Sequence, residues 1–320
     1  MFSIFGGSTV GLDLGQHALR AAVVKSRGGK PEVLSMAEVG LPAGLVSNSF
    51  TEPNIQDTAA FTEAAARLAD IAGARGGAVN VTLPDFVSRV SILEFDSVQP
   101  KDDDTAQMIK WRMKKLLPFD VEQAVMRWQY LGKFVTNEKE QHRFLVSIIK
   151  SDIMSQYESA LKAAGLKPRR IELSSFAVWN LFEPQVSSEA GADGAFALMN
   201  LTGGKMTVIV FDHGVPHFLR IKDMGGIDDT EQAWVTRMVR ELNASVTFYR
   251  ENYGRNAVET VYLTGDMAGL REVSEEITRS AGLKSGLLDP SRVLTLNRRV
   301  TVGPGSLSAY SAACGAAWEA

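Results

Sequence analysis

Cysteine and long apolar runs are scarce in this sequence. Its 320 residues contain one cysteine, Cys314, which excludes an intramolecular disulfide framework and a cysteine-rich zinc site. The small, mostly apolar residues around Cys314 predict a packed thiol and a reducing compartment. No window approaches the roughly 20 apolar residues that a membrane-spanning helix needs, and residues 1–7 are too short for a signal peptide. We therefore expect a cytoplasmic protein.

An excess of charge is also missing. The formal net charge is −3, so bulk electrostatics provide no attraction to nucleic acid, and no nucleic-acid partner is expected. The four histidines form no helical i, i+4 pair with a nearby acid, which argues against a metal site. The basic run 110–115, with Trp111 inside it, is more typical of a solvated helix face than of a lipid-binding surface. With 45% hydrophobic residues, the length favours two domains.

A repeated hairpin pattern is the most informative feature that is present. Residues 10–24 and residues 198–210 each contain an apolar run, a tight turn of small and polar residues, and an alternating apolar run. The two copies align Asp13 with Asn200. Such turns can present backbone N–H groups to a phosphate, and an acid at a strand end can hold a hydrated cation. We interpret the chain as two related halves that clamp a nucleotide between them.

The second copy lacks both diagnostic residues of the first. Asn200 takes the place of the acid, and Thr202 takes the place of Gly15. An amide cannot replace the charge that helps to hold a divalent cation. A single Asp-x-Gly turn is usually only a turn, so the recurrence of the pattern is what supports the nucleotide interpretation.

The remaining pattern predicts an α/β chain with an inserted block. We expect helices over residues 57–72, 102–117, 152–164, 174–182, 231–252 and 306–318, and another after residue 269. We expect strands over residues 78–83, 87–95, 127–133, 144–150 and 260–264, and near 293–296. Residues of about 86–166 form a β-α-β-β-α block that two hairpin-led halves do not need. Residues 184–194, rich in Ser, Gly and Ala, are predicted to link the halves.

Several short motifs occur in a characteristic order along the chain. The first is Gly-hydrophobic-Asp-hydrophobic-Gly around Asp13, with the basic residue Arg20 seven positions later. The others are Trp111 before Pro118-Phe119, Gly165-Leu166-Lys167-Pro168, Ile171-Glu172, Phe176-Ala177, Glu241-Leu242 with Ser245, Phe248-Tyr249, and Leu263-Thr264-Gly265. In these motifs the chain resembles the PilM family of type IV pilus assembly proteins and, more distantly, the division protein FtsA.

The resemblance implies an actin-like, RNase H-like duplicated α/β fold of two domains. Residues 1–85 and 167–183 would form the first actin-like subdomain (1A), with residues 86–166 as an inserted, 1C-like subdomain. Residues 184–320 would form the second domain, with a C-terminal helix that returns to the first half. Because the span from Gly226 to the helix that holds Glu241 is short, we expect a reduced second-half subdomain, a shortened 2B region.

The resemblance also implies a role at the inner membrane. It implies a cytoplasmic platform, peripheral to the membrane, that docks the cytoplasmic N-terminal segment of a PilN-like bitopic membrane protein and meets other inner-membrane pilus components. The inserted block and its junction with the first half are the expected docking region. The residues of the groove are not predicted, and self-association of the chain stays open.

Nucleotide binding is the third implication of the resemblance. The residues expected to contact ATP are Asp13, which would also hold Mg²⁺ through water, Gly15, Gln16, His17, Asn200, Gly203, Gly204, Gly225 and Gly265. Three residues favour weak or lost ATP binding and at most a slow ATPase. They are Asn200, Thr202 and Asp266, the last of which is an acid where the family has glycine. One alternative is an ATP-binding protein whose nucleotide state regulates pilus assembly. A lesser alternative is a small-molecule kinase with Asp212 or Asp223 as its base.

Overall fold

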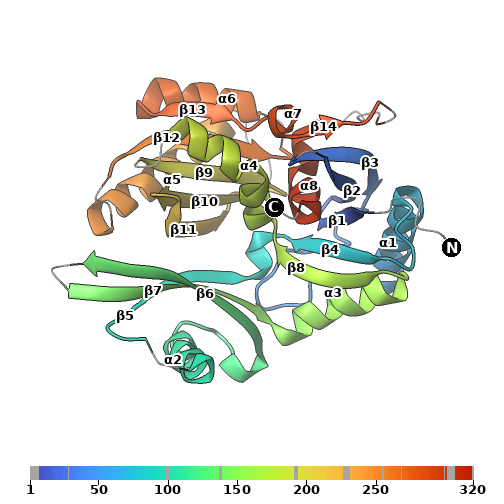
Figure 1. The fold of residues 1–320 in the computed structure, drawn as a ribbon, viewed down its shortest axis with the longest axis horizontal. Coiled ribbons are helices and arrows are strands. Elements are labelled where there is room, and N and C mark those ends of the chain that lie inside the picture. The colour runs from blue at the N-terminus through green and yellow to red at the C-terminus, as the bar shows by residue number, and fades with distance from the viewer. Residues whose placement is uncertain are drawn as a thin grey trace.

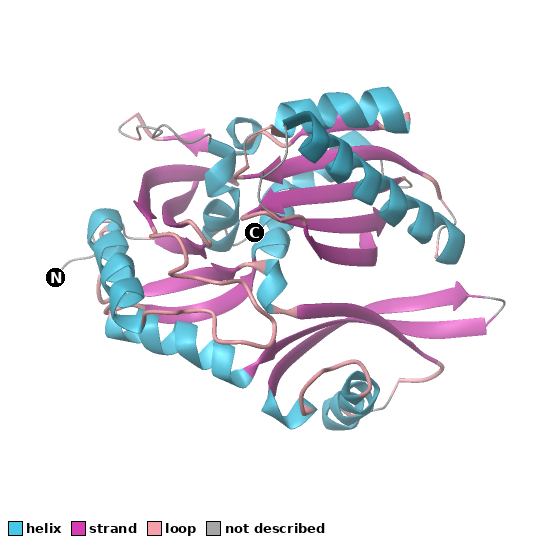
Figure 2. Ribbon diagram, turned by 180° about the vertical axis from the view of Figure 1, so that it is seen from behind, coloured by secondary structure: helices cyan, strands magenta, loops and turns pink. Residues whose placement is uncertain are grey.

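The computed structural model of the protein describes residues 7–27, 29–98, 101–136, 139–190, 194–225, 231–253, 256–267, 269–298, 300 and 307–318. Within these residues two large sheets stand side by side, and a smaller sheet with its own helix lies along them (Figure 1). Figure 2 shows helices on the outer faces of the large sheets and also between them. No helix in this described part is long and apolar enough to cross a membrane.

The first large sheet contains the first predicted hairpin. Its strand order is β14 (Thr295–Leu296), β3 (Lys30–Gly40), β2 (Ala18–Arg27), β1 (Ser8–Leu14), β4 (Ala78–Leu83) and β8 (Lys167–Leu173). β1, β2 and β3 pair antiparallel, whereas β4 pairs in parallel with both β1 and β8. Helices α1 (Thr58–Ala72) and α3 (Ser151–Ala163) pack on this sheet in one shared core.

The second large sheet repeats this arrangement. Its order is β11 (Val215–Asp223), β10 (Lys205–Asp212), β9 (Ala195–Thr202), β12 (Val258–Gly265) and β13 (Lys284–Leu287). Helices α5 (Glu231–Asn252) and α6 (Leu270–Glu276), which continues into a π-helical turn at Ile277–Ala281, pack on it. The order β11-β10-β9-β12-β13 matches β3-β2-β1-β4-β8, so the predicted duplication of the fold is confirmed.

Two helices lie between the halves. They are α4 (Ser174–Ala190) and α8 (Ser311–Ala317), and both contribute to a core that also takes side chains from the two large sheets. A Cβ at Gly11 would come within 2.0 Å of the Ala313 carbonyl oxygen, and a Cβ at Gly315 within 1.9 Å of the Ala177 carbonyl oxygen. The two glycines therefore let the C-terminal helix α8 lie backbone against backbone on β1 and α4. The short helices α7 (Pro290–Val293) and Leu307–Tyr310 precede it.

The inserted block forms the small sheet, in the order β5 (Arg89–Phe95), β7 (Lys139–Lys150) and β6 (Ala124–Thr136). Helix α2 (Asp102–Lys114) covers one face, and short 3-10 helices lie at Asp85–Val87 and Val121–Gln123. The predicted β-α-β-β-α block includes α3. Its buried side chains, such as Tyr157, pack instead with Phe61 of α1, at 6.1 Å between ring centroids.

Several predicted boundaries need correction. Residues 184–190 are helical, not linker, because Val186 is buried in the core around α4 and outweighs the helix-breaking tendency of Pro184; residues 191–193 lie outside the described residues. Helix α2 ends at Lys114, before residue 117, and the hairpin β6–β7 is longer than predicted. β11 ends at Asp223 and α5 begins at Glu231; residues 226–230 between them, like residues 1–6 and residue 306, are also outside the described part.

Candidate functional site

The turns of the two repeated hairpins face each other across the boundary between the halves. Gly203 and Gly204 form the β9–β10 turn with φ values of +55° and +73°, which favour glycine. A Cβ at Gly203 would lie 3.4 Å from Gln16 Oε1 in the β1–β2 turn, so the two turns touch. Asn48 Nδ2 donates a hydrogen bond of 3.4 Å to the same Gln16 oxygen. The cleft between the halves is therefore narrow at this point.

The structure brings the nine residues predicted from the sequence to this one place. An inner cavity of about 30 Å³ is lined by Asp13, Gly15, Gln16, Asn200, Gly203 and Gly265. An outer pocket of about 590 Å³ at its mouth is lined by Gln16, His17, Gly203, Gly204 and Gly225. The inner cavity has room only for water, whereas the volume of the outer pocket lies within the roughly 300–1,000 Å³ typical of small-molecule sites.

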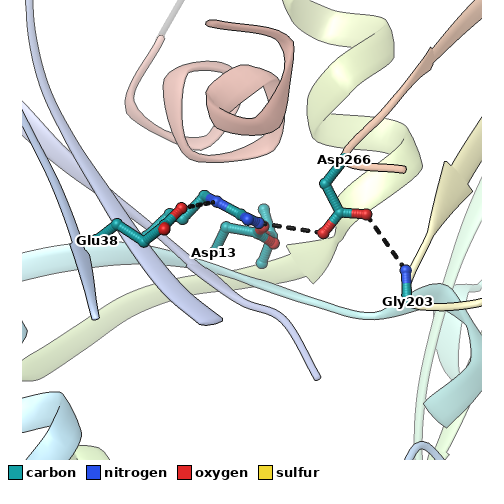
Figure 3. Close-up of polar contacts among 6 residues, drawn as sticks. Asp13, Glu38, Gly203 and Asp266 are labelled. Carbon is teal, nitrogen blue, oxygen red and sulfur yellow. Dashed lines mark hydrogen bonds and ion pairs between the residues drawn. The ribbon is translucent and has the colours of Figure 1, made fainter. Parts of the chain in front are cut away.

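A row of alternating charges crosses the first sheet at the cleft. Arg20 on β2 is the direct cross-strand partner of Asp13 on β1 and of Glu38 on β3. Its Nε donates a 2.6 Å hydrogen bond to Glu38 Oε2 (Figure 3). This register explains why an acid and a base seven residues apart belong to one motif, because the hairpin places them side by side.

Asp13 is buried at the end of β1. Thr82 Oγ1 on β4 donates a 2.7 Å hydrogen bond to Asp13 Oδ1. Burial raises the pKa of the Asp13 carboxyl to about 6, while the Thr82 hydrogen bond and the Arg20 charge act in the opposite direction. The described residues contain no cluster of three or more His, Cys, Asp or Glu side chains that could hold a metal ion.

Asp266 closes the cleft from the second half. Its Oδ2 lies 3.2 Å from Arg20 Nη1, and its Oδ1 accepts a 3.3 Å hydrogen bond from the Gly203 backbone N–H (Figure 3). The preceding Gly265 has φ +143°, and a Cβ there would lie 1.9 Å from the Leu201 carbonyl oxygen. Asp266 N also donates to Leu201 O at 3.1 Å, so the backbone that carries the acid is fixed.

The carboxylate of Asp85, in the first half, bonds to the second half, just as Asp266 of the second half bonds to the first. Asn200 and Thr207 are cross-strand partners on β9 and β10, as Asp13 and Arg20 are in the first half. Thr207 Oγ1 donates a 2.7 Å hydrogen bond to Oδ2 of Asp85, which lies just after β4. Burial raises the pKa of the Asp85 carboxyl, and hydrogen bonds from Ser175 N, Ser175 Oγ, Ser174 Oγ and Thr207 Oγ1 oppose that rise. Asp85 thus corresponds to Asp266, which follows β12.

Three buried polar atoms around the inner cavity have no hydrogen-bond partner within the described part of the chain. They are Asn200 Oδ1, Thr264 Oγ1 and Ser311 Oγ, and their residues all line this cavity. A polar space of this size fits bound water. Asp266, which contacts Arg20 and Gly203, lines both this cavity and the outer pocket.

The residues considered for a kinase have structural partners elsewhere. Asp212 is buried and accepts hydrogen bonds from Asn256 Nδ2 at 2.9 Å and Tyr249 OH at 3.3 Å. Asp223 lines the outer pocket but lies 2.5 Å from Lys205 Nζ. His217 on β11 is buried, with its Nδ1 at 2.7 Å from Arg143 Nη1 of the small sheet.

A second hollow, which we call the apolar groove, lies where the small sheet meets both halves. It holds about 520 Å³ and is lined mainly by Val125, Trp128, Leu131, Leu145, Ile149, Met154, Ile171, Leu173, Phe176, Trp179, Phe211 and Pro216. Arg127 and Glu172 are its charged residues among those described. Two of the elements that line it, β6 and β8, are the end strands of their sheets. The sequence indicated this region but none of these lining residues as a group.

Comparisons with known proteins give consistent results. A family model described as type IV pilus assembly protein PilM matches residues 11–234. A solved PilM-PilN type IV pilus biogenesis complex contains a similar chain, with 19% identity, a TM-score of 0.82, and 97% of each chain covered. A protein of actin-like ATPase fold and unknown function from Bacteroides thetaiotaomicron is similar at 8% identity and a TM-score of 0.54, over 92% of this chain and 96% of that one. No curated protein sequence matches.

Proposed function

Since the chain belongs to the type IV pilus assembly protein PilM family, we propose that it is a docking platform that holds an extended segment of a membrane protein in the apolar groove. The segment is the cytoplasmic N-terminal stretch of a PilN-like bitopic protein. Docking places the platform at the cytoplasmic face of the inner membrane, beside other inner-membrane pilus components. The single observation that carries this proposal is the apolar groove between two end strands.

The backbone of these end strands supports the binding of an extended peptide. The outer edges of β6 and β8 carry N–H and C=O groups outside the ladders of their own sheets. A peptide that adds to such an edge gains main-chain hydrogen bonds, and alternate side chains enter the pockets beside it. The groove offers aromatic and aliphatic surface for those side chains, including Leu131 of β6, Ile171 of β8 and Trp179 of α4.

The charges in the groove define the partner further. Glu172 on β8 is partly buried, and burial raises the pKa of its carboxyl against the opposing effect of Arg170, whose Nη2 lies 3.0 Å from Glu172 Oε1. Arg127 lines the groove from β6. The segment that fits is therefore mainly apolar, with few charged side chains.

Nucleotide binding plays a minor part in this function. The inner cavity of about 30 Å³ supports weak or absent ATP binding and little or no catalysis. The alternative, in which ATP state controls pilus assembly, requires the halves to separate at Arg20 and Asp266. The platform function does not require that separation.

Calorimetric titration of the full chain with a synthetic peptide of the PilN-like N-terminus tests the proposal. We expect saturable binding, lowered at least about tenfold in Ile171→Asp, because a carboxylate must then be desolvated in the apolar groove. Lys167→Asp, on an exposed position of the same strand outside the groove, is the matched control. Failure to bind in the wild type, or equal affinity in Ile171→Asp, would reject the groove. A parallel titration with Mg·ATP distinguishes this proposal from the alternative in which ATP state controls pilus assembly.

A further inference from the structure

The cleft between the halves already contains an anion of its own. The two carboxylate oxygens of Asp266 contact two different donors, Arg20 Nη1 at 3.2 Å and Gly203 N at 3.3 Å. Arg20 belongs to the first half and Gly203 to the second. The side chains of Arg20 and Asp266 are only 11% and 18% exposed, so solvent screens their attraction less than it would at an open surface.

These two donors have the chemistry of a phosphate site. A guanidinium and a backbone N–H from a turn of left-handed glycines are groups that bind phosphate oxygens in proteins. The turn supplies both features, because Gly203 and Gly204 have positive φ. Arg20 keeps its charge, since Asp266, Asp13 and Glu38 together raise the pKa of its guanidinium despite burial.

The position of the acid is built into the fold. Position 265 requires glycine, because a Cβ there would collide with Leu201 O. The Asp266 N–H donates a hydrogen bond to the same carbonyl. Asp266 therefore leaves the end of β12 in a set direction, toward the cleft (Figure 3). Asp85 repeats the arrangement after β4, with its carboxylate bonded to Thr207 of the other half. The two halves are thus joined by a reciprocal pair of carboxylates.

We propose that Asp266 is an internal anionic ligand, which fills the phosphate position between Arg20 and Gly203 and latches the two halves closed. A phosphate-bearing ligand binds there only by displacing the carboxylate of Asp266. The latch is separate from the apolar groove, so it holds whether or not the docking proposal survives. It accounts for an intact Asp13 motif beside an inner cavity that has room only for water.

The probe for this site is inorganic pyrophosphate, titrated calorimetrically into the full chain at low salt. We expect Asp266→Ala and Asp266→Asn to bind pyrophosphate at least about tenfold more tightly than the wild type, because pyrophosphate no longer has to displace the Asp266 carboxylate. Asp70→Asn, which changes the net charge equally on an exposed part of α1, should behave as the wild type. The gain should disappear when Arg20→Gln is added to either variant.

Three results would overturn the proposal. They are equal pyrophosphate affinity in the wild type and both Asp266 variants, an equal gain in Asp70→Asn, or a gain that survives Arg20→Gln. Asp266→Asn keeps the side-chain volume, so it covers the case in which Asp266→Ala does not fold. Peptide titration of the same variants reports on the groove alone and distinguishes failure of the latch from failure of docking.

Discussion

Arg20 Nη1 lies 3.2 Å from Asp266 Oδ2 although the two residues are 246 positions apart in the chain. The contact joins the hairpin of one half to the end of the parallel strand β12 of the other. On the latch proposal, the pair that stabilises the closed arrangement also opposes ligand entry, so stability and binding at this cleft are coupled.

The glycine before the latch should be irreplaceable. Gly265→Ala places a methyl group where only 1.9 Å separates it from Leu201 O, at φ +143°, so we expect a loss of unfolding free energy of at least about 3 kcal/mol. Gly286→Ala on β13 is the control, because its Cβ would meet nothing within 4 Å. Urea denaturation of both variants measures the difference. Similar midpoints for the two would contradict the fixed geometry of the latch.

Asp13 should make stability depend on pH. Its pKa is raised from 3.8 to about 6, so between these pH values the folded state binds a proton that the unfolded state has lost. The free energy of unfolding then falls as pH rises from about 4 to 6, by on the order of 3 kcal/mol in total. Asp13→Asn should remove this fall. Urea denaturation at several pH values measures it.

Thr82 provides the internal comparison for that experiment. Its hydroxyl lowers the pKa of Asp13 by hydrogen bonding to the carboxylate, so Thr82→Val should extend the loss of stability to higher pH. Curves for the wild type and Asp13→Asn that run parallel from pH 4 to pH 8 would show that Asp13 does not titrate in this range.

The second cross-half contact should appear as a coupling energy. Asp85→Asn and Thr207→Val both disturb the 2.7 Å hydrogen bond between the halves, so their effects on unfolding free energy should be non-additive by about 1 kcal/mol. Thr236→Val is the control, because its hydroxyl donates to Gln232 O within α5. Its effect should add to that of Asp85→Asn. Full additivity with Thr207→Val would show that this contact does not join the halves energetically.

Local patterns in the sequence were sufficient for the repeated hairpin and for α1. Alternating apolar residues predicted the strands. Helix α1 spans Thr58–Ala72, close to the predicted 57–72, with Asp57 as its N-cap and the left-handed Gly73 as its C-cap. The turns of the two hairpins, which include Gly15 and Gly204, meet in the structure because the two halves have the same strand order. Their role in nucleotide binding stays a prediction.

Contacts between distant segments could not be predicted in the same way. The sequence showed that Asp266 is an acid where the family has glycine. Its contact with Arg20 could not be predicted, because that contact depends on how the halves close. Asp85 gave no local signal, since its partners on α4 and β10 come together only in the fold. Helix α4 continues past Pro184 because buried side chains hold it, which is again a tertiary effect.

Tryptophan fluorescence should report where the partner peptide binds. Trp179 lines the groove from α4 and stacks on Phe211, with 4.0 Å between the ring centroids. An apolar segment that covers this indole removes water from it, so we expect peptide binding to shift the emission to shorter wavelength. Trp179→Phe should lose most of that shift while it keeps an aromatic ring in the groove.

Trp111 is the matched control for this prediction. It lies on α2 with 62% of its surface exposed, its ring is contacted by Lys115 Nζ at 4.4 Å from the centroid, and it does not line the groove. Trp111→Phe should therefore keep the full shift. If the shift instead disappears in Trp111→Phe and persists in Trp179→Phe, the peptide binds on the outer face of the small sheet, near α2. The groove between β6 and β8 would then have to be given up as the docking site.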